Sequence, residues 1–509
     1  MYGTLWSLLP FFIVIPLAVW TRQVLPGLLV GLLVGAYMLH PSPISGLDTA
    51  LGYILREMAV PDNLRLIVFL YGFGAFVGLV RVTGGVRGFA HWMSGRVQSV
   101  RGAFGVTWLS SFATFMAPDF RIITVAPVMK HIFDRLQVPA SKVAFVIDLT
   151  STPFVALVPV GTAFVGYMVG LIATSGRHEG VAASPYHLFL LSIPLNFFSL
   201  LMIVYGLYDT FFVKPITLSV KESLNSAKVS LSTESRLRLA SEFGRVEAAE
   251  ELGIPGVDHH RRQEFGKDAD DVPDPVEVLA ERIRPRLFNL ALPLTLLLVL
   301  TVAFTWWDGH AKSPSLFGAL ATANAAKAML EALLVTLVVS VVVYSLQQQP
   351  MQRTLFGFLA GGNEMMGVIV LLTLVWALSA VSTDLGFTPY VQRTLGGLVP
   401  PSFIAPALFV FGAAISYVIG SSFGTWGMLM PLGFSLASST HASLPLIVGA
   451  VFASGTFGGF ASPLSDNTVA MATVMKLPIM GYARYKLKPA LLVAGATTVF
   501  YAGAGWLWS

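Results

Sequence analysis

Long apolar stretches recur along nearly the whole chain and restrict its fold more than any other feature. About 20 apolar residues in a helix cross the ~30 Å hydrocarbon core of a bilayer, where only helices and closed barrels satisfy their own backbone. The alternating pattern of barrel strands is absent. The sequence therefore predicts an all-α polytopic membrane protein whose apolar segments lie near 4–20, 24–39, 64–80, 103–117, 143–174, 186–213, 286–307, 316–344, 363–382, 402–438, 444–480 and 488–508.

Charged residues are scarce and unevenly placed. They make up 12% of the 509 residues, about half the ~25% share of a soluble domain. Segment 214–284 alone carries 25 of the 59 charges, which indicates a hydrophilic linker between two membrane halves. The other basic residues sit in short loops, where they orient membrane helices, so we expect membrane lipid and no nucleic acid as partners. The first stretch, 5–20, lacks a cleavage site and predicts a retained helix rather than a signal peptide.

Several apolar stretches are too long for one crossing and contain helix-breaking residues. Breaks at membrane depth free backbone groups that must face protein or a water-filled cavity, and they are typical of secondary transporters. These breaks indicate re-entrant hairpins and broken helices. The residues responsible are Pro153, Pro159, Gly161, Gly420, Pro431, Gly458, Gly459 and Pro463.

The two membrane halves repeat one plan. The run SSFATF from Ser110 is matched by SSFGTW from Ser421, and each precedes a proline. Asp148 follows the first run by 38 residues, and Asp466 follows the second by 45. We expect two repeats, which we take as inverted on mechanistic grounds. The predicted layout is N-terminal membrane helices at 1–60, a first transport repeat at 61–213, the linker at 214–285, connecting membrane helices at 286–350 and a second transport repeat at 351–509.

Asp466 is the strongest candidate for an ion-binding residue. It lies in an apolar region with no Lys or Arg nearer in sequence than Lys476. A buried carboxylate costs several kcal/mol unless it is paired, protonated or bound to a cation. Neighbouring hydroxyl and amide groups supply the oxygen ligands that Na⁺ needs. A simple cap on a helix N-terminus is the structural alternative. The predicted partners are Ser462, Ser465, Asn467 and Thr468.

Asp148 is the matching candidate in the first repeat, together with Thr150 and Ser151. A structural ion pair with Lys142 or another base is its alternative role. Asp148 and Asp466 form the tentative Na⁺ site. Four weaker candidates complete the predicted ion or substrate site: Ser422, Thr425, Glu364 and Asp119, of which the last two could equally be a helix-dipole partner and an ion pair with Arg121.

These motifs are similar to those of a known family. The runs SSFGTWGMLMP (421–431) and FGGFASPLSDNT (457–468), with AFVIDLTSTP (144–153), resemble the NhaC family of sodium/proton antiporters. The resemblance covers most of residues 60–500 and implies two repeats, paired re-entrant hairpins and a homodimer. It also implies ion-site roles for Asp466, Ser462, Ser465 and Thr468. A carboxylate and an imidazole of the family pattern are missing before Ser462, and Arg121 is gained, which favours an anionic substrate.

We therefore expect a secondary transporter that exchanges Na⁺ for H⁺ by alternating access. The alternative is a Na⁺- or H⁺-coupled carrier of a small organic anion or amino acid, with Arg121 or a hairpin N-terminus binding its carboxylate. No Walker loop, dinucleotide turn or nucleophile elbow is present, so we expect no enzyme and no cofactor beyond the transported ions. The expected location is the cytoplasmic (inner) membrane of a prokaryote, in a multi-pass arrangement.

Overall fold

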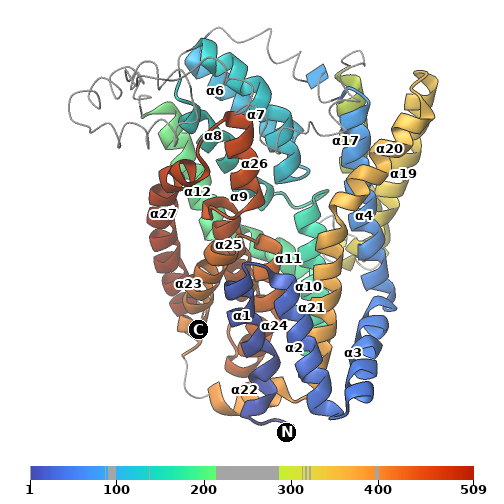
Figure 1. Cartoon of the computed structure of the whole chain (residues 1–509), viewed down its shortest axis with the longest axis vertical. Helices are drawn as coiled ribbons and strands as arrows, with labels where there is room; N and C mark the ends of the chain where they lie inside the picture. Colours follow the sequence, from blue (N-terminus) through green and yellow to red (C-terminus); the bar gives the residue numbers. More distant parts are fainter. Residues whose placement is uncertain are drawn as a thin grey trace, which may run out of the picture.

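The structure is a computed structural model, and every regular element in the part it describes is helical. The described residues are 2–85, 88–89, 99–136, 138–213, 286–311, 313, 315, 318–319, 322–395 and 400–508. The linker predicted at 214–285 lies outside them. "Upper" and "lower" below refer to the view in Figure 1, in which α6 and α7 are at the upper end and both chain termini lie in the lower half.

Seven helices of the described chain are long and apolar enough to cross a membrane, or nine if each of two bent pairs forms one span. The sequence suggested more segments because broken stretches divide into helices that are each too short to span. Stretch 143–174, for example, divides into three helices separated by irregular backbone. The all-helical, multi-span fold with broken helices is thus confirmed.

The N-terminal region is a helical hairpin followed by a sharp bend. Its helices are α1 (Leu9–Thr21), preceded by the short η1 (Leu5–Leu8), α2 (Val24–Leu39) and α3 (Pro43–Met58). Helix α1 ends at Arg22, whose φ of 55° is left-handed, and α2 returns beside it. The axes of α2 and α3 differ by 120°. The tip of the α1–α2 hairpin lies at mid-height, against the start of α24 (Figure 1).

The first half of the membrane region continues with one long helix and a series of short ones. They are α4 (Pro61–Val82), α6 (Val100–Leu109), η2 (Ser110–Ala113), α7 (Pro118–Arg135), α8 (Ala140–Leu149), α9 (Thr152–Val155), α10 (Ala163–His178), α11 (Pro185–Ser192), η3 (Ile193–Leu195) and α12 (Phe197–Phe211).

The second half follows a similar plan after its connecting helices. It comprises α17 (Phe288–Gly309), α19 (Ala325–Leu346), α20 (Met351–Glu364), α21 (Met366–Asp384), α22 (Phe387–Leu395), α23 (Pro401–Ile419), α24 (Ser422–Thr440), α25 (Leu444–Ala461), α26 (Asp466–Met475) and α27 (Ile479–Leu507).

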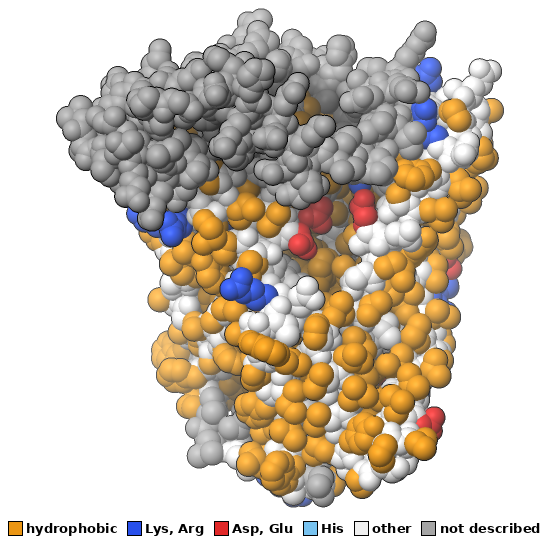
Figure 2. Space-filling view, viewed as in Figure 1, with side chains coloured by type: hydrophobic (Ala, Val, Ile, Leu, Met, Phe, Trp, Pro, Cys, Tyr) orange, Lys and Arg blue, Asp and Glu red, His pale blue; other side chains and the backbone are white. Residues whose placement is uncertain are grey.

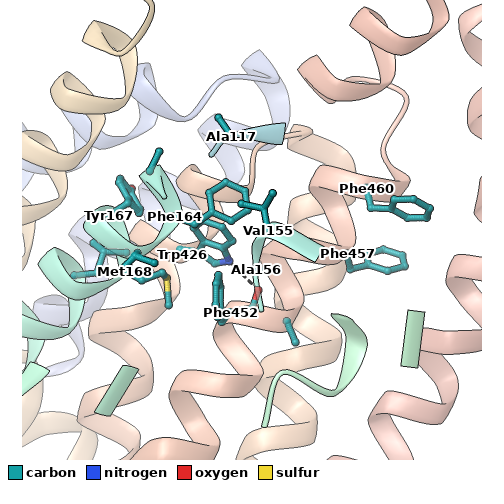
Figure 3. Packing of buried hydrophobic residues seen from close by; sticks show 14 of the residues in the cluster. Ala117, Val155, Ala156, Phe164, Tyr167, Met168, Trp426, Phe452, Phe457 and Phe460 are labelled. Carbon is teal, nitrogen blue, oxygen red and sulfur yellow. Dashed lines mark hydrogen bonds between the residues drawn. The ribbon is translucent and has the colours of Figure 1, made fainter. Parts of the chain in front are cut away.

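A cluster of buried aromatic side chains joins the two halves at the centre (Figure 3). Phe164 and Tyr167 of α10 pack against Trp426 of α24, and Phe452 of α25 packs on the other side of that indole. The polar atoms of this cluster are satisfied by backbone, since the Tyr167 hydroxyl donates to the Phe423 carbonyl (2.8 Å) and the Trp426 indole N–H donates to the Phe452 carbonyl (2.9 Å). The cluster therefore fixes α24 and α25 against α10.

Candidate functional site

Two helical hairpins and two helix breaks meet at the centre of the molecule. The first hairpin consists of α6, η2 and α7 with its tip at 110–117, and the second consists of α23 and α24 with its turn at 420–421. The first comes from the upper end and the second from the lower end (Figure 1). The first break (150–162) separates α8 from α10, apart from the single turn of α9, and the second (462–465) separates α25 from α26. Nothing in the sequence alone placed these four segments together.

The two breaks are joined by a direct hydrogen bond. The Asn467 amide donates to the Thr152 hydroxyl at 2.7 Å, and both residues are buried. The amide oxygen of Asn467 has no hydrogen-bond partner although it is buried. Asn467 was predicted as a site residue, and the structure places it where the two breaks touch. Thr152 was not predicted, although it lies within the same Thr-Ser-Thr-Pro motif.

Hydroxyl side chains of the second break hold its backbone together. Ser462 donates to the Tyr417 carbonyl (2.6 Å), Ser465 to the Gly459 carbonyl (2.6 Å) and Thr468 to the Ser462 carbonyl (2.6 Å). These bonds satisfy carbonyls that the missing helical turn leaves open. Their role as cation ligands stays a prediction, and it is compatible with these bonds, because a hydroxyl that donates its hydrogen keeps oxygen lone pairs for a cation.

The turn of the second hairpin packs tightly against α25. The hydroxyls of Ser416 and Ser422 both donate to the Gly455 carbonyl, at 3.2 and 2.9 Å. Gly420 forms the turn with a left-handed φ of 80°. A Cβ atom on Gly459 would lie 2.1 Å from the Ser422 hydroxyl oxygen, so only glycine fits there. Thr425 is buried one turn further on and donates to the Ser421 carbonyl (2.9 Å).

Arg121 fastens the tip of the first hairpin to the first break. Its guanidinium is fully buried, and its five N–H groups donate only to neutral oxygens. The acceptors are the Thr107 carbonyl (2.8 Å) and the hydroxyls of Ser110 (3.0 Å), Thr114 (2.8 Å) and Thr150 (3.2 Å from Nε, 2.7 Å from Nη2). Thr150 is thus a partner of Arg121, while Ser151 donates to the Ile147 carbonyl (2.7 Å).

Asp148 is paired with a lysine that lies 338 residues away in the sequence. Lys486 of α27 donates to its Oδ2 at 2.5 Å, and the Tyr482 hydroxyl donates to the same atom at 2.9 Å. Both charged side chains are completely buried. Lys486 also donates to Thr468 of α26 at 2.7 Å. Asp148 therefore already holds an internal cation. The alternative role, an ion pair with Lys142 or another base, is observed with Lys486 as the base, whereas Lys142 contacts Asp209.

Asp119 and Asp466 are two site carboxylates that are exposed, as Glu364 also is. Each occupies the first turn of its helix, α7 and α26, and these two helices pack against each other. The packing of α7 against α26 places Asp119 near Asp466. Among the described residues, no Lys or Arg lies within 4 Å of either carboxylate. Figure 2 shows acidic side chains gathered around a hollow in this face.

Glu364 borders the same region from the other side. It ends α20 and accepts a hydrogen bond from Arg81 of α4 at 2.7 Å. Arg81 is 5% exposed, whereas the Glu364 side chain is 47% exposed. Glu364 lies at the junction of two helices, since it ends α20 and directly precedes Met365, the N-cap residue of α21. Its carboxylate ties α20 to α4.

Lys486 and Tyr482 are the main residues that sequence reasoning missed. The signal was present, because the buried positions of α27 follow a helical spacing that includes both. They are Tyr482, Ala483, Lys486, Ala490, Val493, Thr497, Tyr501 and Gly505. A lysine on the apolar face of a membrane helix predicts a buried acidic partner. The three basic residues of 484–488, together with Lys476, looked instead like a charged loop.

The donor set of this centre suits a monovalent cation or a proton. Carboxylates, hydroxyls and backbone carbonyls are hard oxygen ligands. No group of three or more His, Asp or Glu residues able to hold a metal ion occurs in the part of the chain that the structure describes. The arrangement thus offers two neighbouring carboxylates at helix N-termini rather than a closed metal cage.

Sequence comparison identifies the family. A model described as the Na⁺/H⁺ antiporter family matches residues 162–506, about two thirds of the chain. The chain belongs to the Na⁺/H⁺ antiporter family. This membership confirms the NhaC resemblance, and it makes the protein a multi-pass membrane transporter rather than an enzyme.

Individual relatives agree with this family. An uncharacterized protein of Haemophilus influenzae is 25% identical over 527 aligned positions that cover 100% of this chain and 92% of the relative. The malate-2H⁺/Na⁺-lactate antiporter of Bacillus subtilis is 27% identical over 124 residues, which are 22% of this chain and 26% of that protein. The MtrF structure of Neisseria gonorrhoeae, described as one of a class of antimetabolite efflux pumps, aligns over 90% of this chain and 84% of its own with a TM-score of 0.53 and 12% identity. That likeness supports the fold alone.

Proposed function

We propose that this protein exchanges Na⁺ for H⁺ across a prokaryotic inner membrane, with both ions binding at Asp466 and its neighbour Asp119. The observation that carries this proposal is the pair of exposed carboxylates at the facing starts of α7 and α26, beside a hollow and without a basic partner among the described residues. Two neighbouring carboxylates repel each other, so one of them gains a proton or the pair gains a cation. Competition between these two states is the chemical basis of exchange.

The pair of carboxylates proposed here differs from the pair that the sequence predicted. The sequence suggested that Asp148 and Asp466 share an ion, but Asp148 is neutralised by Lys486 at 2.5 Å. Asp119 takes its place as the neighbour of Asp466. We infer that the Asp148–Lys486 pair instead links α8 and α27, and that Thr468 couples this pair to the helix that carries Asp466.

We further propose that the two halves are inverted repeats with re-entrant hairpins. The hairpins come from opposite ends of the molecule and meet at mid-height, as such repeats require (Figure 1). Each hairpin is followed in sequence by a broken helix, α8–α10 in one half and α25–α26 in the other. Movement of one hairpin and its broken helix relative to the other helices then exposes the carboxylates to one side of the membrane or the other. The predicted homodimer stays part of this proposal.

A coupled carrier of a small organic anion or amino acid is the second candidate. One observation that favours it is the segment matched by a malate and lactate antiporter. The other is that four helices begin at the breaks or hairpin tips, and helix N-termini attract anions. These helices are α7, α10, α24 and α26. Arg121 does not support it in this conformation, because all five of its N–H groups are already used.

Purified protein in lipid vesicles tests the proposal. An inward Na⁺ gradient should drive proton movement, read by a trapped pH-sensitive dye. Asp466→Asn should lower the rate at least tenfold because a neutral amide cannot exchange a proton for a cation. Asp48→Asn is the matched control, since Asp48 is exposed on α3 far from the hollow, and it should leave the rate unchanged.

Two results would contradict this assignment. Full exchange by Asp466→Asn would remove Asp466 from the ion site. Proton movement that requires an added carboxylate or amino acid, with none driven by Na⁺ alone, would instead establish the carrier.

A further inference from the structure

A second polar cavity lies in the lower part of the molecule, away from the hollow with Asp119 and Asp466. It is enclosed by the C-terminal portions of α10, α21 and α24, with Phe11 and Phe387 forming its apolar wall. Its volume of about 10 Å³ is enough for one particle the size of a water molecule or a bare Na⁺ ion. No organic substrate fits.

Hydroxyl residues make up most of the polar residues that line this cavity. Five hydroxyl residues from three helices contribute to it: Ser175, Ser379, Ser382, Thr383 and Ser435. One carboxylate joins them, because Glu179 also lines the cavity and accepts a hydrogen bond from the Ser435 hydroxyl at 2.5 Å. These residues come from sequence positions 175–435, so only the fold brings them together.

Ser382 provides an independent sign that the cavity is built for a ligand. Its side chain is 2% exposed, and its hydroxyl oxygen has no hydrogen-bond partner. A serine in a helix commonly donates to the carbonyl four residues earlier, as Thr383 does to Ser379 at 2.9 Å. An unpaired buried hydroxyl costs about 1–3 kcal/mol, so it persists where a ligand satisfies it. The Nε2 atom of His178, on the same wall, is also buried without a partner.

We propose that this cavity is a second Na⁺ site, formed by Glu179 and the surrounding hydroxyls and separate from the site at Asp466. One carboxylate with neutral hydroxyl oxygens balances a single positive charge, whereas divalent cations are usually bound by more carboxylates. The volume admits one small ion without its hydration shell. A Na⁺ ion here would bind α10, α21 and α24 together.

Thermal unfolding of the purified full chain in detergent tests this site. The melting temperature is measured against increasing NaCl, with choline chloride keeping the ionic strength constant. Bound Na⁺ stabilises the folded protein in proportion to the logarithm of its concentration above Kd. Wild type and Asp466→Asn should both be stabilised by Na⁺. Ser382→Ala and Glu179→Gln should need at least tenfold more Na⁺ for the same shift.

Matched controls separate a ligand effect from a packing effect. Ser340→Ala removes a buried hydroxyl from α19 that already donates to the Thr336 carbonyl (2.6 Å), and Glu331→Gln removes an exposed charge from the same helix. Both should keep the wild-type Na⁺ response. Without Na⁺, Ser382→Ala should be at least as stable as wild type, because the hydroxyl that it removes has no partner.

The inference fails in either of two cases. If Ser382→Ala lowers stability equally with and without Na⁺, the cavity holds only a structural water. If Asp466→Asn abolishes the whole Na⁺ response while Glu179→Gln keeps it, all bound Na⁺ is at the Asp466 site. The second result would leave the proposed exchange intact, whereas full exchange by Asp466→Asn would remove that proposal without affecting this cavity.

Discussion

Lys486 is a completely buried cation whose hydrogen-bond partners come from other helices. Its ammonium contacts the Asp148 carboxylate at 2.5 Å and the Thr468 hydroxyl at 2.7 Å, and it lies 5.1 Å from the centre of the Phe460 ring. The aromatic ring and the hydroxyl offset part of its desolvation. The remaining Oδ1 atom of Asp148 has no hydrogen-bond partner. The pair is therefore balanced only while both charges are present.

Removing one member of this pair should be much worse than removing both. Lys486→Met leaves the Asp148 charge buried and alone, which costs about 3–5 kcal/mol, and Asp148→Asn leaves the ammonium alone with a similar cost. The double variant should recover most of the loss. Melting temperatures of the four proteins give the coupling. Lys488→Met, which changes an exposed lysine, is the control. If the stability loss of the double variant equals the sum of the losses of the two single variants, the two charges act separately.

At the scale of helices, glycines decide how closely α4 and α20 approach. Gly74 and Gly78 of α4 face Gly357 and Gly361 of α20 over two turns. A Cβ on Gly78 would lie 2.1 Å from the Gly357 carbonyl oxygen, and a Cβ on Gly361 would lie 2.2 Å from that of Gly74. Small residues at this spacing let membrane helices pack backbone to backbone. The close approach also brings Arg81 to Glu364 beside the hollow.

Gly78→Ala should therefore push α4 and α20 apart. We expect a loss of about 1–3 kcal/mol in stability, typical of overpacking, together with slower exchange because the Arg81–Glu364 contact is stretched. Gly495→Ala is the control, since a Cβ there meets no atom within 4 Å. Alanine at that helical position should stabilise the protein by up to ~1 kcal/mol. Thermal unfolding checks both variants, and an unaffected Gly78→Ala would show that the interface yields easily.

For the whole molecule, the sequence predicted the helical membrane fold and the positions of its breaks, because these depend on local features. Gly420 does end a helix, and the chain does break after Asp148 and before Asp466. The partners of those aspartates were not predictable in the same way. The pairing of Asp148 with Lys486, and the packing of α7 against α26 that places Asp119 near Asp466, both join segments more than 300 residues apart. Local sequence patterns determine where a helix ends, but not which residues of other segments it contacts.

The lower end of the molecule is held together by ionic contacts between α3, α10 and α21. Glu57 lies 3.7 Å from Arg177, and Asp384 lies 3.8 Å from Arg56 and accepts a hydrogen bond from Tyr53. The acidic hollow lies higher on the molecule (Figure 2). Under the alternating access that we propose, these contacts would keep the lower side closed. Weakening the lower contacts should raise the population of the opposite state, about tenfold for each 1.4 kcal/mol.

Cysteine labelling can measure this shift because the chain contains no cysteine of its own. We expect Asp466→Cys to react with a membrane-impermeant thiol reagent mainly from the upper side. Gln348→Cys, in the loop before α20, and Ser42→Cys, before α3, are exposed references for the upper and lower sides. Adding Glu57→Gln should raise labelling of Asp466→Cys from the lower side and reduce it from the upper side. Because the two states share one population, alternating access requires these opposite changes; an increase from both sides at once would indicate a continuous pore.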